Sequence, residues 1–433
     1  MNNLLVKLQN AKKYQPSLAL LSLAERNKIL ISAAELLEKN KRKILSANDQ
    51  DLKNLQRVDM HDRLVLNDKR LLSMEQGLQA LTKLPDSLNK ILEKKDLKNG
   101  LHLSKISVPL GVVAVIYESR PNVTIDLAAL AIKTGNALVL KGGSEAYRTN
   151  KVLVSLIHQA LAKHRLSPNL VCLIDSKENW QKVLLNAHGL VDVLVPRGSQ
   201  GLIEWVIKNS RLPIIETGAG VCHIFVDADV NVAKAADIIV NAKAQRPDVC
   251  NALDTVVIHR KSLNAVMSEL AKKFIAFSQW APLRCAMVPI GQRYVEIFAD
   301  DESYRILKNV YPMKFLRKAK PTDFGKEFLS LKMSIKTVGS FEEGLAFVKQ
   351  KTSGHSESIL SKNPKHIARF LNEVDAAVVY QNASTRFTDG GEFGMGAEAG
   401  ISTQKLHARG PMGMEALTSY KWVAKGDWLV RKQ

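Results

Sequence analysis

The chain has 433 residues, of which 46% are hydrophobic and 24% charged, and its formal net charge is +20. This length exceeds one ordinary hydrophobic core, so two or three domains are expected. No run of about 18 uncharged apolar residues exists, and the N-terminus lacks the apolar core of a signal peptide, so neither a membrane span nor secretion is expected. The Lys and Arg residues are spread along the chain, which favours a solvated basic surface over a nucleic-acid motif.

The cysteines Cys172, Cys222, Cys250 and Cys285 are scattered without paired CxxC spacing. This pattern argues against a zinc site and against a disulfide framework. It is typical of a protein in a reducing cytoplasm, which is where we expect this chain.

The N-terminal part of the chain is predicted to be helical. Residues 18–48 carry an apolar stripe at helical spacing, and helical patterns continue to about Leu92. Residues 101–109 then alternate apolar and polar side chains, which predicts a strand with one solvated face, either at a sheet edge or between subunits.

From Gly111 the pattern changes to alternating strands and helices. Continuous apolar runs over 112–116, 136–140, 170–174 and 191–195 are typical of strands buried on both faces. Helices are expected between them, over 126–133, 148–163 and 179–187. This alternation predicts a parallel, doubly wound sheet with crevices at the carboxyl ends of its strands.

Two glycine-containing loops follow strands of this sheet, although no GxGxxG fingerprint is present. In the loop 141–145, glycines let the backbone approach a ligand and Lys141 offers a positive charge. The loop 196–201 opens a helix, which is a natural seat for a phosphate. Taken singly, each loop is more often a plain turn than a binding site.

A helical pattern over 232–240 ends before Pro247, and residues 255–258 read as a buried strand. Cys250 therefore lies on a loop between a helix and a strand. It is either a small buried hydrophobe or a nucleophile, whose thiolate the nearby Lys243 and Arg246 would favour. Residues 213–220 form a further strand-to-glycine-loop pattern.

The tract 382–396 is rich in Gly, Ser, Thr and Asp and is long for a loop. It also contains aromatic residues and Arg386, which are not typical of a mobile linker, so a binding site is favoured.

Several stretches together resemble one family, the gamma-glutamyl phosphate reductases, a branch of the aldehyde dehydrogenase superfamily. The resemblance covers nearly the whole chain from about residue 20, and the stretches that carry it are 108–112, 116–124, 140–146, 246–253, 353–359 and 382–413. It implies an aldehyde-dehydrogenase-like α/β fold with a Rossmann-like cofactor domain, an α/β catalytic domain and a small oligomerisation flap.

The resemblance also implies domain boundaries. Residues 1–230 would form the NADPH-binding domain, with 97–110 as a flap strand. Residues 231–366 would form the catalytic domain that carries Cys250. Residues 367–433 would supply the return segment, the substrate loop and an oligomerisation strand.

The chemistry implied is NADPH-dependent reduction of L-glutamyl 5-phosphate to L-glutamate 5-semialdehyde, with release of phosphate, in the second step of proline biosynthesis. Cys250 matches the family nucleophile, and Asn122 matches the amide that binds the oxyanion. The candidate cofactor residues are Lys141, Gly142, Ser144, Arg197, Gly198, Ser199 and Glu327. The candidate substrate residues are Arg120, Ser384, Arg386 and Gly396, with Arg386 suited to either a carboxylate or a phosphate.

Glu216 aligns with the general base of hydrolytic aldehyde dehydrogenases, which an acyl-phosphate reductase does not need. His223 and His355 are more often structural than proton carriers, and no metal is expected. The expected partners are the small-molecule substrate, further copies of the chain and, as a candidate, a glutamate kinase that hands over the labile acyl phosphate.

Two alternatives stay open at this point. One is a hydrolytic, NAD-linked aldehyde dehydrogenase, and the other is a basic, non-enzymatic binding protein on the same fold.

Overall fold

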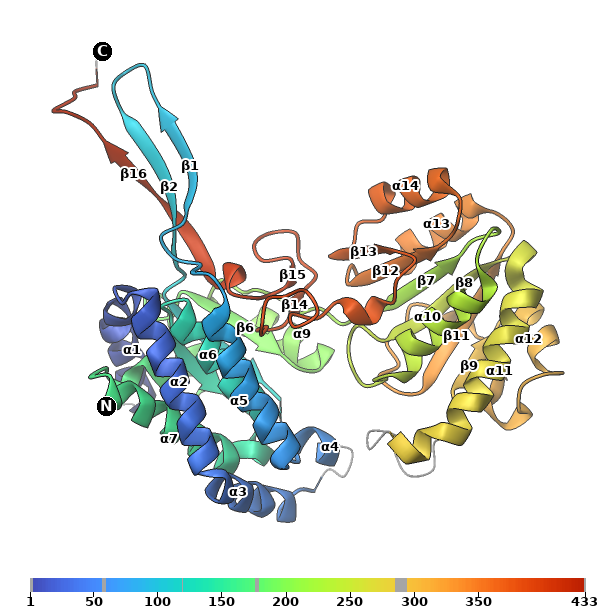
Figure 1. The fold of residues 1–433 in the computed structure, drawn as a ribbon, viewed down its shortest axis with the longest axis horizontal. Helices are drawn as coiled ribbons and strands as arrows, with labels where there is room; N and C mark the ends of the chain where they lie inside the picture. Colours follow the sequence, from blue (N-terminus) through green and yellow to red (C-terminus); the bar gives the residue numbers. More distant parts are fainter. Residues whose placement is uncertain (1–2, 57–59, 119, 176–178, 285–293, 432–433) are drawn as a thin grey trace. The chain divides into compact units, whose positions relative to one another are not determined.

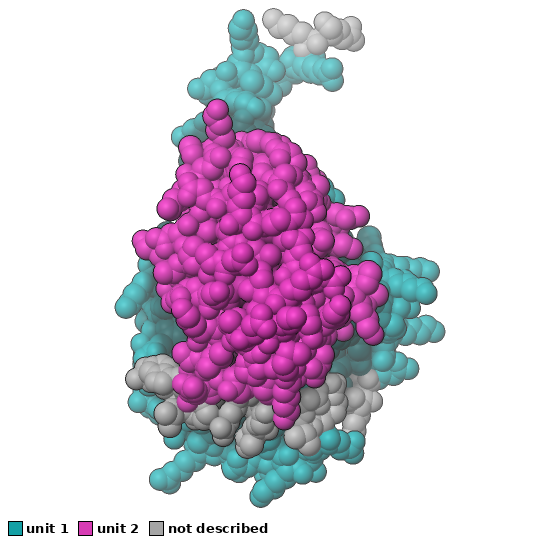
Figure 2. All heavy atoms as spheres, turned by 90° about the vertical axis from the view of Figure 1, so that its right-hand side faces the viewer, with its two compact units in different colours: residues 1–217, 393–400, 406–433 teal, residues 218–392, 401–405 magenta. Residues whose placement is uncertain are grey.

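Hydrophobic runs that mark buried strands form parallel sheets in two separate units of this computed structural model (Figure 1). The structure describes residues 3–56, 60–118, 120–175, 179–284 and 294–431, so Cys285 lies outside the described residues. Unit 1 comprises residues 1–217, 393–400 and 406–433, and unit 2 comprises 218–392 and 401–405. Figure 2 colours the atoms of the two units, which are described here one at a time.

Unit 1 contains a four-stranded parallel sheet in the order β5-β4-β3-β6. Its strands are β3 (Val112–Tyr117), β4 (Ala137–Lys141), β5 (Val171–Leu173) and β6 (Val193–Arg197). The helices that follow these strands are α6 (Pro121–Lys133), α7 (Tyr147–Lys163), α8 (Gln181–Leu184) and α9 (Gln200–Asn209). All six residues of β3 are buried, as expected for the central strand of a sheet covered on both faces.

Further helices at the N-terminus extend the core of unit 1. They are α1 (Asn3–Ala19), α2 (Leu23–Lys39), α3 (Lys41–Lys53), α4 (His61–Leu64) and α5 (Asp68–Lys83). Ser22 and Glu25 form a capping box that begins α2, which packs against α5 and α7. The buried apolar side of α2 joins the same hydrophobic core as the sheet.

A three-stranded antiparallel sheet also belongs to unit 1 and extends away from its helices (Figure 1). Its strands are β1 (Ile91–Asp96), β2 (His102–Pro109) and β16 (Thr418–Lys425), in the order β1-β2-β16. Most of its side chains are exposed or half-buried. It matches the expected flap in position, with β2 in its centre.

Unit 2 is built on a seven-stranded parallel sheet in the order β10-β9-β11-β8-β7-β12-β13. Its strands are β7 (Cys222–Val226), β8 (Leu253–His259), β9 (Glu296–Ala299), β10 (Leu316–Lys318), β11 (Lys332–Val338), β12 (Ser356–Leu360) and β13 (Val378–Gln381). Its helices are α10 (Val232–Ala244), α11 (Arg260–Arg284), α12 (Asp301–Leu307), α13 (Phe341–Lys351) and α14 (Pro364–Glu373). The remaining strands of the chain are the two-residue β14 (Ile401–Ser402) and β15 (Gly410–Pro411).

Alternate residues of the central strands in unit 2 enter two different cores. Ile224 and Val256 pack with α10 and α11, whereas Phe225 and Val257 pack with α13 and α14. This period of two shows that helices cover both faces of the sheet. The α/β aldehyde-dehydrogenase-like fold class is confirmed.

Some local expectations were wrong. Helical structure does not continue to Leu92, because residues from Ile91 pair with β2 as a strand. Residues 101–109 do not form an edge strand, since β2 has a partner on each side. The helix expected over 179–187 shortens to α8, and residues 213–220 form only an isolated bridge at Ile214.

The units also divide the chain differently from the expected domains. The first boundary falls after Thr217 rather than after residue 230, because β7 pairs with β8 and β12. Unit 2 continues to Glu392 rather than ending at 366, since β13 completes its sheet.

Candidate active site

Cys250 lies on the loop between α10 and β8 in unit 2 and is half-buried. Pro247 prevents α10 from continuing, so the chain turns before it enters the buried strand β8. Arg246, whose Nε lies 3.6 Å from Asp248 Oδ1, adds a positive charge to this loop. Half-burial gives the thiol the access that a nucleophile needs, and a nearby guanidinium favours its thiolate form.

The segment that ends at Cys222 packs directly against the backbone of Cys250. A Cβ atom on Gly220 would lie 1.7 Å from the carbonyl oxygen of Cys250, so only glycine fits there. The Cys222 thiol donates to that same carbonyl oxygen across 3.3 Å. Burial is the main reason that the pKa of Cys222 is raised well above its usual value, which keeps the thiol protonated as a donor.

Arg386 lies next to the nucleophile loop within unit 2. Its Nε donates to Gln245 Oε1 at 3.1 Å, and its Nη1 donates to Asn251 Oδ1. Burial, followed by the charge of Arg246, lowers the pKa of Arg386, while Asp389 and Cys250 oppose that shift. Arg386 therefore places a second guanidinium close to Cys250.

The loop that carries Arg386 is tied to the nucleophile loop by hydrogen bonds. Asn251 Nδ2 donates to the carbonyl oxygen of Thr388 at 2.7 Å, and Thr385 Oγ1 donates to the carbonyl oxygen of Asn251 at 2.8 Å. Ser384 is buried and its Oγ accepts the backbone N–H of Arg386, so it shapes the turn.

Strand β12 anchors the same loop from the other side. Ser356 Oγ lies 2.7 Å from Thr388 Oγ1, and Ser358 Oγ donates to the carbonyl oxygen of Ala383. His355 Nδ1 contacts Ser356 Oγ at 2.8 Å, and burial lowers the pKa of His355 to about 4. A neutral His355 is therefore a structural hydrogen-bonding group at physiological pH.

His223 is fully buried beside Glu357, with 3.1 Å between Nδ1 and Oε2. Glu357 also accepts the backbone N–H of His223, so the pair fastens β7 to β12. Both histidines thus have the structural surroundings that the sequence favoured.

Asn122 lies in the first turn of α6 in unit 1 and is exposed there. Its Nδ2 donates to Asp126 Oδ2 at 3.2 Å, which orients the amide and leaves its second N–H for another acceptor. Burial raises the pKa of Asp126 to about 6, against opposing effects from Arg197 and Asn122. Arg120 is the residue immediately before this helix.

A cavity of about 290 Å³ opens at the carboxyl ends of β3 and β4 in unit 1. Its walls include Lys141, Gly142 and Ser144, three of the expected cofactor residues. Lys141 Nζ lies 5.5 Å from the centre of the Trp180 ring and donates to the carbonyl oxygen of Gly142, and burial lowers the pKa of Lys141. A cation, a glycine backbone and an indole face fit the adenosine end of a dinucleotide.

Glu118 links the two glycine-containing loops and was not singled out from the sequence. It lines the cavity, and its carboxylate accepts from Ser199 Oγ at 2.8 Å. A Cβ on Gly198 would lie 2.8 Å from its side chain. Its position directly after β3 is the signal that could have found it. Trp180, which also lines the cavity, lies immediately before α8.

The other expected residues have separate surroundings. Arg197 Nη1 donates to the carbonyl oxygens of Glu398 and Ala399. Glu327 accepts the backbone N–H of Gly220 at 2.9 Å in unit 2, whereas Gly396 belongs to unit 1 and packs against Leu84. Glu216 is half-buried in unit 1.

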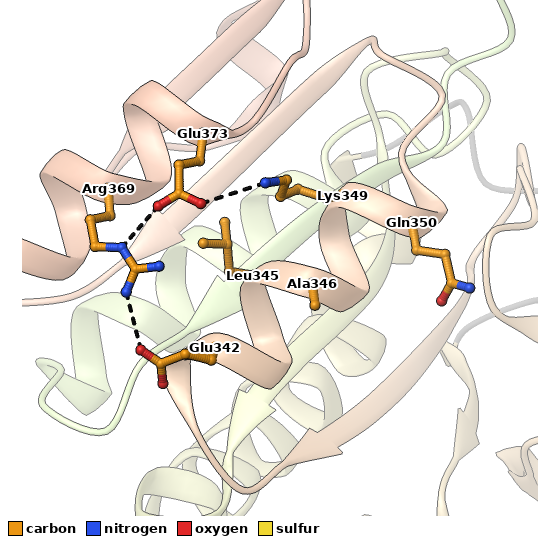
Figure 3. A pocket seen from close by; sticks show the side chains of 7 residues that line it. All are labelled: Glu342, Leu345, Ala346, Lys349, Gln350, Arg369 and Glu373. Carbon is orange, nitrogen blue, oxygen red and sulfur yellow. Dashed lines mark hydrogen bonds and ion pairs between the residues drawn. The ribbon is translucent and has the colours of Figure 1, made fainter.

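A groove of about 480 Å³ lies between α13 and α14, and four of its lining residues are charged (Figure 3). Arg369 bonds to both Glu342 and Glu373, and Lys349 pairs with Glu373. These charges neutralise one another, so the groove is a surface ion-pair network rather than an active site.

Among the described residues, no three His, Cys, Asp or Glu side chains are grouped so that they could hold a metal ion. None of the helices in the described ranges is both long and apolar enough to cross a bilayer.

Comparisons with known proteins identify the family of this chain. The model of the aldehyde dehydrogenase family matches residues 6–290. A gamma-glutamyl phosphate reductase of Chlorobium chlorochromatii is 44% identical over 431 residues, 99% of each chain. The solved gamma-glutamyl phosphate reductase of Thermotoga maritima is 36% identical with a TM-score of 0.89, covering 100% of both chains. An engineered glycolyl-CoA reductase, solved with bound NADP+, shares the fold at 16% identity and a TM-score of 0.68, covering 98% of this chain and 96% of that one.

The chain is therefore a member of the aldehyde dehydrogenase family. Within that family, it belongs to the gamma-glutamyl phosphate reductases. It is accordingly an enzyme of the oxidoreductase class.

Proposed function

We propose that this chain reduces L-glutamyl 5-phosphate to L-glutamate 5-semialdehyde and phosphate, through a thioester on Cys250, in the second step of proline biosynthesis. The observation that carries the proposal is the half-buried Cys250, on the same loop as Arg246 and electrostatically coupled to Arg386, in a chain that matches a gamma-glutamyl phosphate reductase over 99% of its length.

The Cys250 thiolate attacks the acyl carbon, the bond from that carbon to the phosphate oxygen breaks, and phosphate leaves. Arg386 neutralises charge on the anionic substrate, and Arg246 adds to the positive field around the thiolate. The Asn122 amide, oriented by Asp126, supplies a donor to the oxyanion.

When bound, NADPH supplies a hydride to the thioester carbon. Lys141 and the backbone of 142–144 hold the adenosine end in the cavity beside Trp180. Lys141 is the stronger candidate for the 2′-phosphate, because Arg197 already donates to two carbonyl oxygens. Glu327 would contact the nicotinamide ribose. Breakage of the carbon–sulfur bond after hydride transfer releases the aldehyde and restores the Cys250 thiolate.

Further copies of the chain are proposed partners, with the sheet β1-β2-β16 as the contact. Tyr420 and Trp422 expose 51% and 45% of their surface on one face of that sheet. A glutamate kinase is the proposed source of the acyl phosphate, whose lability favours direct delivery.

The decisive assay follows NADP+ reduction with glutamate 5-semialdehyde at increasing phosphate concentrations. The rate is expected to rise with phosphate and saturate, because phosphate must cleave the Cys250 thioester in this direction. A rate indifferent to phosphate would instead support the hydrolytic, NAD-linked alternative. Cys250→Ala should abolish reduction while NADPH binding stays roughly intact.

A further inference from the structure

A buried ion pair lies behind the nucleophile loop of unit 2, and the proposed chemistry does not use it. Lys243 is in the last turn of α10 and Asp254 is the second residue of β8, four residues after Cys250. Their side chains are 0% and 2% exposed, and Nζ lies 3.9 Å from Oδ1. Because desolvation of both charges offsets their attraction, a pair of this kind is a poor source of stability.

The Asp254 carboxylate accepts backbone hydrogen bonds from two distant segments. Oδ1 accepts the N–H of Phe328 at 2.9 Å, and Oδ2 accepts the N–H of Cys222 at 3.4 Å. Lys243 Nζ donates to the carbonyl oxygen of Ser330 at 3.0 Å. The pair therefore holds the segment 328–330 at two points and the start of β7 at a third.

Glu327 stands directly before the held segment and touches the nucleophile loop through one residue. Its Oε1 accepts the N–H of Gly220, whose Cα faces the backbone of Cys250 too closely for any side chain. Contacts therefore lead from the Lys243–Asp254 pair to the backbone of Cys250 by two routes, one through the Glu327 segment and Gly220 and the other through Cys222. Each link lies within unit 2.

We propose that the Lys243–Asp254 pair is a positioning device that sets the Glu327 carboxylate relative to Cys250. This inference rests on the proposed roles of Cys250 and Glu327. Backbone N–H and C=O groups that bond to buried charges cannot move without leaving a charge unpaired. The Glu327 segment therefore has one low-energy arrangement. The pair thus governs cofactor binding and the hydride step rather than the reactivity of the thiol.

The test is Asp254→Asn, which keeps the shape of the side chain, removes its charge and one acceptor, and loosens residues 328–330. We expect KM for NADPH to rise and the single-turnover hydride step to slow by about 10-fold to 100-fold, as small misplacements of reacting groups do. Alkylation of Cys250 by iodoacetamide, followed by mass analysis of its peptide, should keep its wild-type rate within about twofold, since both routes of contact from the pair end at the backbone of Cys250.

Two further variants make the result decisive. Glu296→Gln weakens the half-buried pairs that Glu296 makes with Lys332 at 3.1 Å and with Arg317 at 3.5 Å on the same sheet, and should change none of these rates. If Asp254→Asn does not fold, Lys243→Met combined with Asp254→Asn removes both buried charges, and the same split is expected.

Equal slowing of alkylation and hydride transfer, or an unchanged KM for NADPH, would overturn the positioning role. The underlying chemistry is tested separately. If Cys250→Ala still reduced the substrate, the thioester would be refuted, whatever the result for Asp254→Asn.

Discussion

Single residues around Cys250 are constrained by contact distances that leave no room for substitution. Gly220→Ala would push a methyl group into the carbonyl of Cys250, with atoms separated by 1.7 Å. We expect the nucleophile loop to shift and kcat/KM to fall by at least about 100-fold. Steady-state kinetics on the purified variant, with circular dichroism to check folding, measures this.

Gly77→Ala is the matched control, because a Cβ there meets no atom within 4 Å and the residue lies inside α5. It should keep full activity and raise the free energy of unfolding by about 0.5–1 kcal/mol, since alanine loses less backbone entropy in a helix. Equal loss of activity in both variants would show that the tight contact at Gly220 is unimportant.

Asp126 predicts a pH dependence of stability. Its pKa is about 6 in the folded chain, mainly because of burial, and close to the ordinary value of 3.8 when unfolded. The folded state then binds more protons between about pH 4 and 6, so the free energy of unfolding falls as pH rises through that window, by at most about 3 kcal/mol. Denaturant titrations of wild type and Asp126→Asn should show that this slope is lost in the variant; identical slopes would argue against the shift.

At the scale of elements, β12 is a buried strand with an unusually polar sequence. Ser356 and Ser358 would be costly inside a sheet unless their hydroxyls were bonded, and both bond to the loop that carries Arg386. The strand therefore holds the loop that carries Arg386, which in turn bonds to the nucleophile loop at Asn251. This explains a Ser-rich motif that sequence patterns alone mark only as a family signature.

Thr388→Val tests this connection, because it keeps the shape but removes the hydroxyl that contacts Ser356 and Tyr380. Loss of two buried hydrogen bonds should raise KM for the acyl phosphate by an amount equivalent to about 1–3 kcal/mol, with the Kd for NADPH unchanged. Thr388→Ser retains the hydroxyl and should restore most of the affinity. A Ser variant as weak as the Val variant would point to packing of the methyl group instead.

Sequence patterns located the four strands of the parallel sheet in unit 1, and β8 in unit 2, because a continuous apolar run marks a buried strand whatever its partners. The same patterns predicted no range for β9, β10 or β11. They missed β1, whose Glu and Lys residues form a strand only because β2 lies beside it. The same limit applies to the site. Cys250 and Lys141 could be found from local motifs, whereas Asp254 and Glu118 act through residues far away in the chain, and no local pattern encodes such contacts.

For the whole molecule, the exposed aromatic face of the sheet β1-β2-β16 predicts self-association. Trp422→Glu places a charge on that face and should reduce the molar mass measured by light scattering after size-exclusion chromatography. Leu371→Glu, on the exposed side of α14, is the control and should leave the mass unchanged. A wild-type mass for Trp422→Glu would exclude this face as the contact.

The covalent step is tested most directly by a single turnover without phosphate. Enzyme mixed with glutamate 5-semialdehyde and NADP+ should make about one NADPH per Cys250 and then stall, because the thioester has no phosphate to accept its acyl group. Mass analysis should find one glutamyl group on the peptide that contains Cys250, and added phosphate should release it and restart turnover. Continuous NADPH formation without phosphate, or an unmodified Cys250 after the burst, would contradict the account.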